Sequence, residues 1–153
     1  MNRQVSHIYI YQGCRLLFQL RDNKPEIFYP DRWGLFGGTV DEGETPAQAI
    51  KREVAEELSW TPPEPKYLLT WEEPDRACTS YIFGVPLTVP TSELTLTEGQ
   101  AFGLFTFEEL TQLLLVPKIS QMLPQVVEAI AFPELTAAWQ EFNTKKLTRG
   151  IPH

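Results

Sequence analysis

A charged segment, residues 38–60, constrains this 153-residue chain more than any other feature. It follows a double glycine and leads into a predicted helix rich in carboxylates. Thr45 is suited to cap that helix, a proline occupies its first position, and Gln48 completes a capping box. No further glycine or proline interrupts the helix before Leu58, and two adjacent prolines follow soon after. The segment therefore predicts a tight turn followed by one helix.

The helix carries three carboxylates on one side. At about 100° per residue, Glu53, Glu56 and Glu57 fall within one arc of roughly 100°. A neighbouring arc is apolar and should face the core; it holds Ala47, Ile50, Val54 and Leu58. The carboxylates are thus expected at the edge of the buried face. A solvated acidic face is the alternative, but carboxylate oxygens also suit hard divalent cations such as Mg²⁺ or Mn²⁺.

Other residues of the segment favour the metal-site interpretation. Glu44 and Arg52 could orient a ligand carboxylate from behind. Gly37 and Gly38 have no Cβ, so backbone carbonyls there can approach a metal closely. A divalent cation beside a glycine turn is suited to chemistry on phosphates.

The segment resembles the Nudix box, the signature of the Nudix hydrolases. That pattern is Gly, five residues, Glu, seven residues, Arg-Glu, an apolar residue, any residue, Glu-Glu, any residue, Gly, an apolar residue. The matching positions are Gly38, Glu44, Arg52, Glu53, Val54, Glu56, Glu57 and Trp60. Ser59 stands where the family usually has Gly, which affects the turn after the helix and not the chemistry.

The resemblance implies an α/β Nudix fold, with a mixed β-sheet sandwiched between α-helices. It implies a metal-dependent hydrolase that cleaves the diphosphate linkage of a nucleoside diphosphate joined to another moiety, such as a (d)NTP or nucleotide sugar. Mg²⁺ or Mn²⁺ would be held by Glu53, Glu56, Glu57 and the Gly38 carbonyl. Arg52 would pair with a ligand glutamate and Glu44 would hold Arg52. The alternative is a Nudix-fold module that senses a nucleotide without cleaving it, but such proteins typically lose box carboxylates.

Glu98 is a candidate outside the box. It lies on a loop beside Gly99, just before the last predicted strand. Several Nudix enzymes place a further metal-binding or basic glutamate on this loop. The resemblance therefore makes Glu98 a candidate metal ligand, and either Glu53 or Glu98 the general base.

Three further residues are candidates for substrate binding. Trp33 could stack on a base or sugar, although core packing is the commoner role. Arg21 and Arg76 could each bind a terminal phosphate, or be surface arginines. Glu72, Glu73 and Asp75 lie on a loop that could rim the cleft. Family members that clear oxidised guanine nucleotides often carry an asparagine near a proline after the last strand. No asparagine lies near Pro117, so that substrate is disfavoured, and nucleotide sugars and nucleoside triphosphates are equally favoured.

Composition is consistent with a single enzyme domain, residues 1–153. The net charge of −7 argues against long nucleic acid, and no apolar run approaches a membrane span. Cys14 and Cys78, without a secretion signal, favour the cytoplasm. His7 is expected to be structural and His153 is terminal, so no histidine-based site is expected. The predicted partner is a small nucleotide-type molecule, and a homodimer is left open.

The predicted elements follow a mixed α/β order. Strands are expected at residues 5–11, 15–20, 33–36, 66–71, 79–85 and 102–107. Besides the box helix, helices are expected at 107–115 and 119–131, with a helical tail to residue 144. Residues 21–31 and 86–97 are expected to be loops.

Overall fold

The computed structural model describes residues 2–148, so His153 lies outside the described residues. The strands form one seven-stranded sheet: β1 (Arg3–Gln12), β2 (Arg15–Leu20), β3 (Trp33–Gly34), β4 (Phe36–Thr39), β5 (Lys66–Glu73), β6 (Cys78–Pro86) and β7 (Ala101–Phe105). The helices are α1 (Pro46–Leu58), α2 (Phe107–Leu110), α3 (Pro117–Ile130) and α4 (Pro133–Thr148), with short 3₁₀ turns η1 (Pro74–Arg76) and η2 (Thr91–Glu93).

Strand β1 is the centre of the sheet. Along one edge it pairs with β6 in parallel over its whole length, beginning with Arg3 opposite Cys78. Along the other edge it pairs first with β4 and then, from Ile10 onward, with β2. The main path runs β3-β2-β1-β6-β5, and β7 pairs with β2. The combination of one parallel pair with antiparallel neighbours confirms the predicted mixed sheet.

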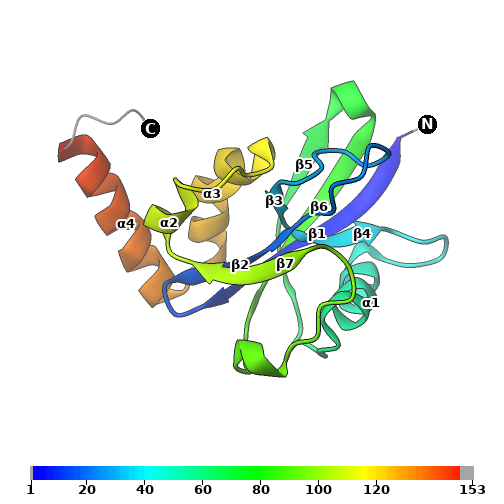
Figure 1. Cartoon of the computed structure of the whole chain (residues 1–153), viewed down its shortest axis with the longest axis horizontal. Coiled ribbons are helices and arrows are strands. Elements are labelled where there is room, and N and C mark those ends of the chain that lie inside the picture. The colour runs from blue at the N-terminus through cyan, green and yellow to red at the C-terminus, as the bar shows by residue number, and fades with distance from the viewer. Residues whose placement is uncertain (1, 149–153) are drawn as a thin grey trace.

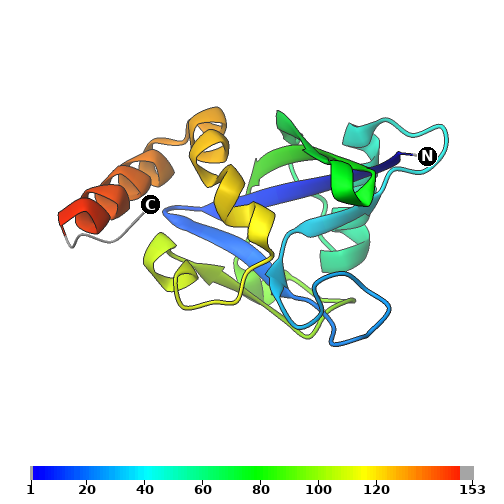
Figure 2. The same cartoon turned by 90° about the horizontal axis from the view of Figure 1, so that it is seen from above.

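Apolar clusters lie on both faces of the sheet, whose strands and flanking helices are drawn in Figure 1. Ile8 and Ile10 point to one face, where they pack with α1, while Tyr9 points to the other face and packs with α3. This alternation follows from the two-residue period of a strand. The two cores hold α1 and α3 on opposite sides of the sheet, and α4 lies at the end of the molecule away from the start of β1 (Figure 2).

Helix α1 begins and ends where the sequence predicts. The Thr45 side chain accepts from the Gln48 amide, and the Gln48 side chain accepts from the Thr45 amide, which completes the capping box. The helix ends at Ser59, whose backbone is left-handed (φ 51°). The buried face differs from the predicted one: Ala49 and Glu57 are buried, whereas Ala47 is only partly buried.

Other boundaries shift by a few residues. The predicted strand 33–36 is split into β3 and β4 at buried Leu35. The last strand ends at Phe105 because Thr106 caps α2 through a capping box with Glu109. The helix predicted to reach residue 115 stops at Leu110, and the tail helix is longer than expected. No helix within the described residues is long and apolar enough to cross a membrane.

Candidate active site

Arg52 is the centre of the charged network on α1. Its Nε and Nη2 atoms donate to the two oxygens of Glu44 at 2.8 and 3.0 Å, and its Nη1 donates to Glu53 Oε1 at 3.0 Å. Nη2 also donates to the Thr39 carbonyl at 3.1 Å. The hydrogen bond with Glu44 holds the pKa of Arg52 above its usual value and the pKa of Glu44 below it. Arg52 is thereby fixed as a charged fork that links Glu44 to Glu53.

Glu57 is the buried carboxylate of the network. Its side chain is only 3% exposed, so it lies within the buried face of α1 and not at the edge expected for all three glutamates. The position is tolerated because Oε1 accepts from the Gly37 amide at 3.0 Å and Oε2 accepts from Gln19 at 3.4 Å. Burial raises the pKa of Glu57 to about 8, and the charges of Glu53 and Glu98 add to the rise.

The double glycine predicted to form a turn lies instead within strand β4, where it pairs with β1. Gly37 has φ of +142°, and a Cβ there would lie 2.0 Å from the Ser6 carbonyl oxygen. A Cβ on Gly38 would lie 2.5 Å from Glu53 Oε1. The absence of side chains at these two positions is what lets the carboxylates of α1 reach the backbone of β4.

The loop before β7 is tied to the end of α1. The Thr97 amide donates to the Glu57 carbonyl at 3.0 Å, and the Thr97 hydroxyl donates to the Glu56 carbonyl at 2.7 Å. These bonds satisfy carbonyls that have no partner within the helix. The two bonds hold the loop so that exposed Glu98 lies on the acidic side of α1. Burial is the main cause that raises the pKa of Glu53, and the charges of Glu56 and Glu98 raise it further. Glu53 and Glu98 therefore interact electrostatically.

The donor set of this cluster suits a hard divalent cation. Within residues 2–148, no three acidic, histidine or cysteine side chains converge closely enough to enclose a metal ion. Their hydrogen bonds orient them apart: Glu57 faces Gly37 and Gln19, and Glu53 faces Arg52. Oxygen ligands are nevertheless the kind that Mg²⁺ prefers, and Gly38 leaves a cradle that a Cβ would fill. The residues that could hold the ion are Gly38, Glu53, Glu56, Glu57 and Glu98.

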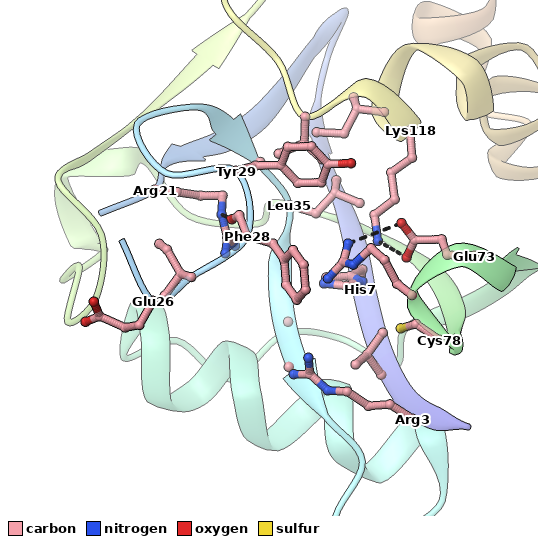
Figure 3. A pocket seen from close by; sticks show the side chains of 18 residues that line it. Arg3, His7, Arg21, Glu26, Phe28, Tyr29, Leu35, Glu73, Cys78 and Lys118 are labelled. Carbon is pink, nitrogen blue, oxygen red and sulfur yellow. Dashed lines mark hydrogen bonds and ion pairs between the residues drawn. The ribbon is translucent and has the colours of Figure 1, made fainter. Parts of the chain in front are cut away.

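A cavity of about 350 Å³ opens on the α3 side of β4 (Figure 3). Gly37 and Gly38 line it, so strand β4 lies between the cavity and the carboxylates of α1. Arg21 and Arg76, two predicted substrate-binding residues that are far apart in sequence, both line it. Arg21 Nε donates to the Phe28 carbonyl at 3.1 Å, and this bond ties the Arg21 side chain to the loop between β2 and β3.

Trp33 does not belong to this cavity. Its ring packs edge-on against Phe105, with centroids 4.9 Å apart, and its backbone pairs with the segment before α3. Core packing, the alternative weighed for this tryptophan, is therefore its observed environment. The aromatic side chains that line the cavity are Phe28 and Tyr29, on the loop predicted from residues 21–31.

Sequence reasoning missed three residues of this region. Lys118 lines the cavity from the first turn of α3, and a lone lysine after Val116-Pro117 gave no signal for it. Phe28 lies in a polar loop without periodicity. Gln19, which binds Glu57, had a weak signal: it is a polar residue in a strand that is otherwise apolar on both sides.

Comparisons with known proteins agree with this geometry. The sequence model of the NUDIX domain matches residues 1–126. Over 46 residues, 30% of this chain, the sequence is 46% identical to the nucleoside triphosphatase NudI of Salmonella schwarzengrund; the match spans 31% of that protein. The crystal structure of a MutT NUDIX hydrolase from Burkholderia pseudomallei superposes with a TM-score of 0.70 at 26% identity, covering 82% of this chain and 98% of that one. The NUDIX domain of Shewanella oneidensis NrtR, solved with ADP ribose, shares the fold with a TM-score of 0.70 at 18% identity over 86% of this chain and 90% of that one.

Proposed function

Because this chain belongs to the Nudix hydrolase family, we propose that it is a divalent-metal-dependent hydrolase of the diphosphate linkage in a nucleoside diphosphate derivative. A (d)NTP and a nucleotide sugar are two such substrates, and neither is favoured over the other. We also propose a cytoplasmic location and a small nucleotide-type ligand. NudI is named a nucleoside triphosphatase, and the NrtR domain was solved with ADP ribose; both are consistent with a substrate of this class.

One observation carries the proposal. The buried Glu57, the Arg52-bound Glu53 and the loop carboxylate Glu98 lie on one side of the glycines of β4, and a cation-lined cavity lies on the other side. A diphosphate beside these glycines would have its scissile linkage near the carboxylates and its attached moiety in the cavity. Such an arrangement separates the reacting centre from the recognition site.

The chain's own residues would divide the work of hydrolysis. A bound Mg²⁺ or Mn²⁺ would supply charge neutralisation at the phosphate oxygens and a more acidic water. Glu53 or Glu98 would accept the proton of the attacking water. Arg52 would hold Glu53 in one orientation, and Glu44 would hold Arg52, so that the base position is fixed before substrate arrives. The products would be two phosphate-bearing fragments.

A phosphate-release assay over a panel of (d)NTPs and nucleotide sugars tests the proposal. With millimolar Mg²⁺ the wild-type protein should hydrolyse at least one compound, and EDTA should abolish this. Glu57→Gln should lower kcat by at least about 100-fold, since it removes a ligand of the metal ion that stabilises the transition state by several kcal/mol. Glu64→Gln, a change of an exposed glutamate after α1, is the matched control and should leave kcat unchanged.

Two results would contradict the proposal. Full turnover in EDTA would remove the role of the metal. Tight binding of a panel nucleotide without release of any product would indicate the sensor alternative. A sensor would not depend on Glu57 as a metal ligand, so Glu57→Gln would then bind the nucleotide in EDTA with the affinity of the wild-type protein.

A further inference from the structure

The cavity is positively charged in a protein whose net charge is −7. Four basic side chains line it, from Arg3, Arg21, Arg76 and Lys118, against the two acidic ones of Glu26 and Glu73. His7 adds no charge, because burial, followed by the charges of the neighbouring lysine and arginines, lowers its pKa well below the usual value. The cavity therefore holds an excess of two positive charges (Figure 3).

Two of these cations share a single carboxylate. Glu73, at the end of β5, accepts from Arg76 Nη1 at 3.3 Å and from Lys118 Nζ at 3.2 Å. The side chains of Glu73 and Lys118 are only 13% and 11% exposed, so solvent screens the group weakly. Arg76 Nε is buried and has no hydrogen-bond partner in the described part of the chain. One carboxylate thus leaves donor capacity and positive charge uncompensated.

The third cation, Arg21, faces the same space from the opposite wall. It forms no ion pair with a carboxylate among the described residues, and its only side-chain hydrogen bond there is to the Phe28 carbonyl. Burial lowers the pKa of Arg21 and the charge of Arg76 lowers it further, whereas the charges of Glu57 and Asp22 only partly oppose this, so the two guanidinium groups repel each other across the cavity. An anion between them would relieve that repulsion.

The lining does not suit an adenine base. Hydrogen bonds to the edge of adenine are commonly made by asparagine and glutamine, and neither residue lines the cavity. Phe28 is occupied, because the Arg76 guanidinium lies 3.8 Å from its ring centroid. This stacking holds Arg76 in place while leaving its remaining donors free.

We propose that the moiety joined to the diphosphate carries an oxyanion of its own, a phosphate monoester or a carboxylate, and that Lys118, Arg76 and Arg21 bind it in this cavity. The proposal rests on the proposed function for the location of the diphosphate. Arginine and lysine are the usual partners of such groups, and arginine can bind them in two-pronged fashion. Glu73 would act as a competing carboxylate that keeps the empty cavity partly neutral.

Inorganic phosphate tests the cavity without any reaction. In EDTA the acidic cluster on α1 repels phosphate, so binding reports on the basic cavity. Phosphate titrated at constant ionic strength should raise the Tm of the wild-type protein relative to chloride. Lys118→Met and Arg76→Met should each weaken phosphate binding at least tenfold, whereas Glu73→Gln should tighten it because it frees both cations.

A matched control is available on α4. Lys145 also pairs with a glutamate, Glu108 at 3.1 Å, but lies far from the cavity lining. Lys145→Met should bind phosphate like the wild type. Absence of phosphate binding by the wild type up to about 10 mM, or equal affinity in all variants, would overturn the proposal. If the methionine variants do not fold, Lys118→Arg and Arg76→Lys replace them in the phosphate titration, because these variants keep the charge and change only the geometry of the donors.

Matched substrates test what the cavity selects. UDP-glucuronic acid differs from UDP-glucose by a carboxylate, and NADPH differs from NADH by a phosphate, so the two pairs separate the two oxyanion sources. Each is assayed as a substrate, or as a competitive inhibitor of whichever panel nucleotide is hydrolysed. In at least one pair the charged member should bind at least tenfold more tightly, through KM or Ki and not kcat, and Lys118→Met should remove that preference.

The outcomes separate this inference from the proposed function. Equal affinity for both members of both pairs overturns the inference and leaves hydrolysis standing. Phosphate binding in EDTA that depends on Lys118, without hydrolysis of any compound in Mg²⁺, supports the anion site and overturns the proposed function.

Discussion

Glu57 shows how one residue can be costly to the fold and useful to the site. Its carboxylate is almost fully buried, and its two hydrogen bonds come from neutral groups, Gly37 and Gln19. Neutral donors compensate a buried charge less well than a cation does. The position is therefore one where a divalent ion would relieve electrostatic stress.

The pKa of Glu57 predicts a pH dependence of stability. The unfolded carboxyl titrates near 4.5, whereas the folded one titrates near 8, mainly because of burial. Between these values the folded state binds more protons, so the free energy of unfolding falls as pH rises. In EDTA, wild type should lose about 2–4 kcal/mol relative to Glu57→Gln between pH 5 and pH 8, measured by urea denaturation. Parallel pH profiles for the two proteins would contradict this; the opposite effect of His7 cancels because both proteins contain it.

Ser59 is a departure from the family pattern that is visible in the sequence alone. The family pattern has glycine there, and the structure gives Ser59 a left-handed backbone with φ of 51°. Such a conformation costs a residue with a Cβ roughly 1 kcal/mol. Helix α1 thus ends in a left-handed residue although that residue is not glycine.

At the scale of elements, α1 and the loop before β7 act as one unit. The loop's hydrogen bonds to the end of α1 are made by the backbone and hydroxyl of Thr97, so they bring Glu98 near Glu53 whatever the glutamate itself contributes. The predicted approach of this loop to the helix is present in the structure. The kinetics of variants distinguish three roles for Glu98: general base, metal ligand or neither.

Conservative substitution separates these roles. If Glu98 acts with Glu53, Glu98→Gln should lower kcat at least tenfold and change stability by no more than about 0.5 kcal/mol. Glu53→Gln should lower kcat more, and the double variant should lose less than the product of the two effects, as expected for groups acting as one unit. Glu93→Gln, an exposed change earlier in the same loop, is the control. A wild-type kcat for Glu98→Gln would leave the base to Glu53 or to a metal-activated water.

Element prediction succeeded where local signals were strong. The capping box set the start of α1, and the apolar stretches on either side of Gln12-Gly13-Cys14 indicated β1 and β2, because both signals lie within a few residues of the element they define. The helix predicted to run to residue 115 was too long because Leu113 and Leu115 serve as packing contacts in a connection, whereas Leu114 is exposed. Periodicity cannot distinguish these uses.

At the scale of the whole molecule, the cavity was beyond sequence reasoning. Its walls come from β1, the loop between β2 and β3, β4, η1 and α3, and only the sheet register brings them together. Arg21 and Arg76 were candidates individually, but their proximity to Lys118 depends on tertiary contacts that no local pattern encodes. The acidic cluster, by contrast, was predictable because a single helix holds most of it.

Helix α4 extends beyond the residues that match the family, yet it shares the core. Leu135 on α4 is fully buried in the cluster around α3. If residues 1–153 form one domain, Leu135→Ala should lower the free energy of unfolding by about 2–5 kcal/mol and shift a single transition to lower Tm. Calorimetry should give equal van't Hoff and calorimetric enthalpies. Gln140→Ala, exposed on the same helix, should change little, and separate melting of α4 would contradict a single domain.

The parallel pairing of β1 with β6 has a consequence for how the chain folds. Arg3 meets Cys78 only after the β1–β2 hairpin, α1 and β5 have all been placed between them. Long-range parallel pairing is slow, because a large loop must close before its contacts form. During synthesis, α1 can assemble from neighbouring residues before the cavity residues Glu73, Arg76 and Lys118 have emerged from the ribosome. The chain should therefore acquire its acidic helix early and its ability to hold a ligand late.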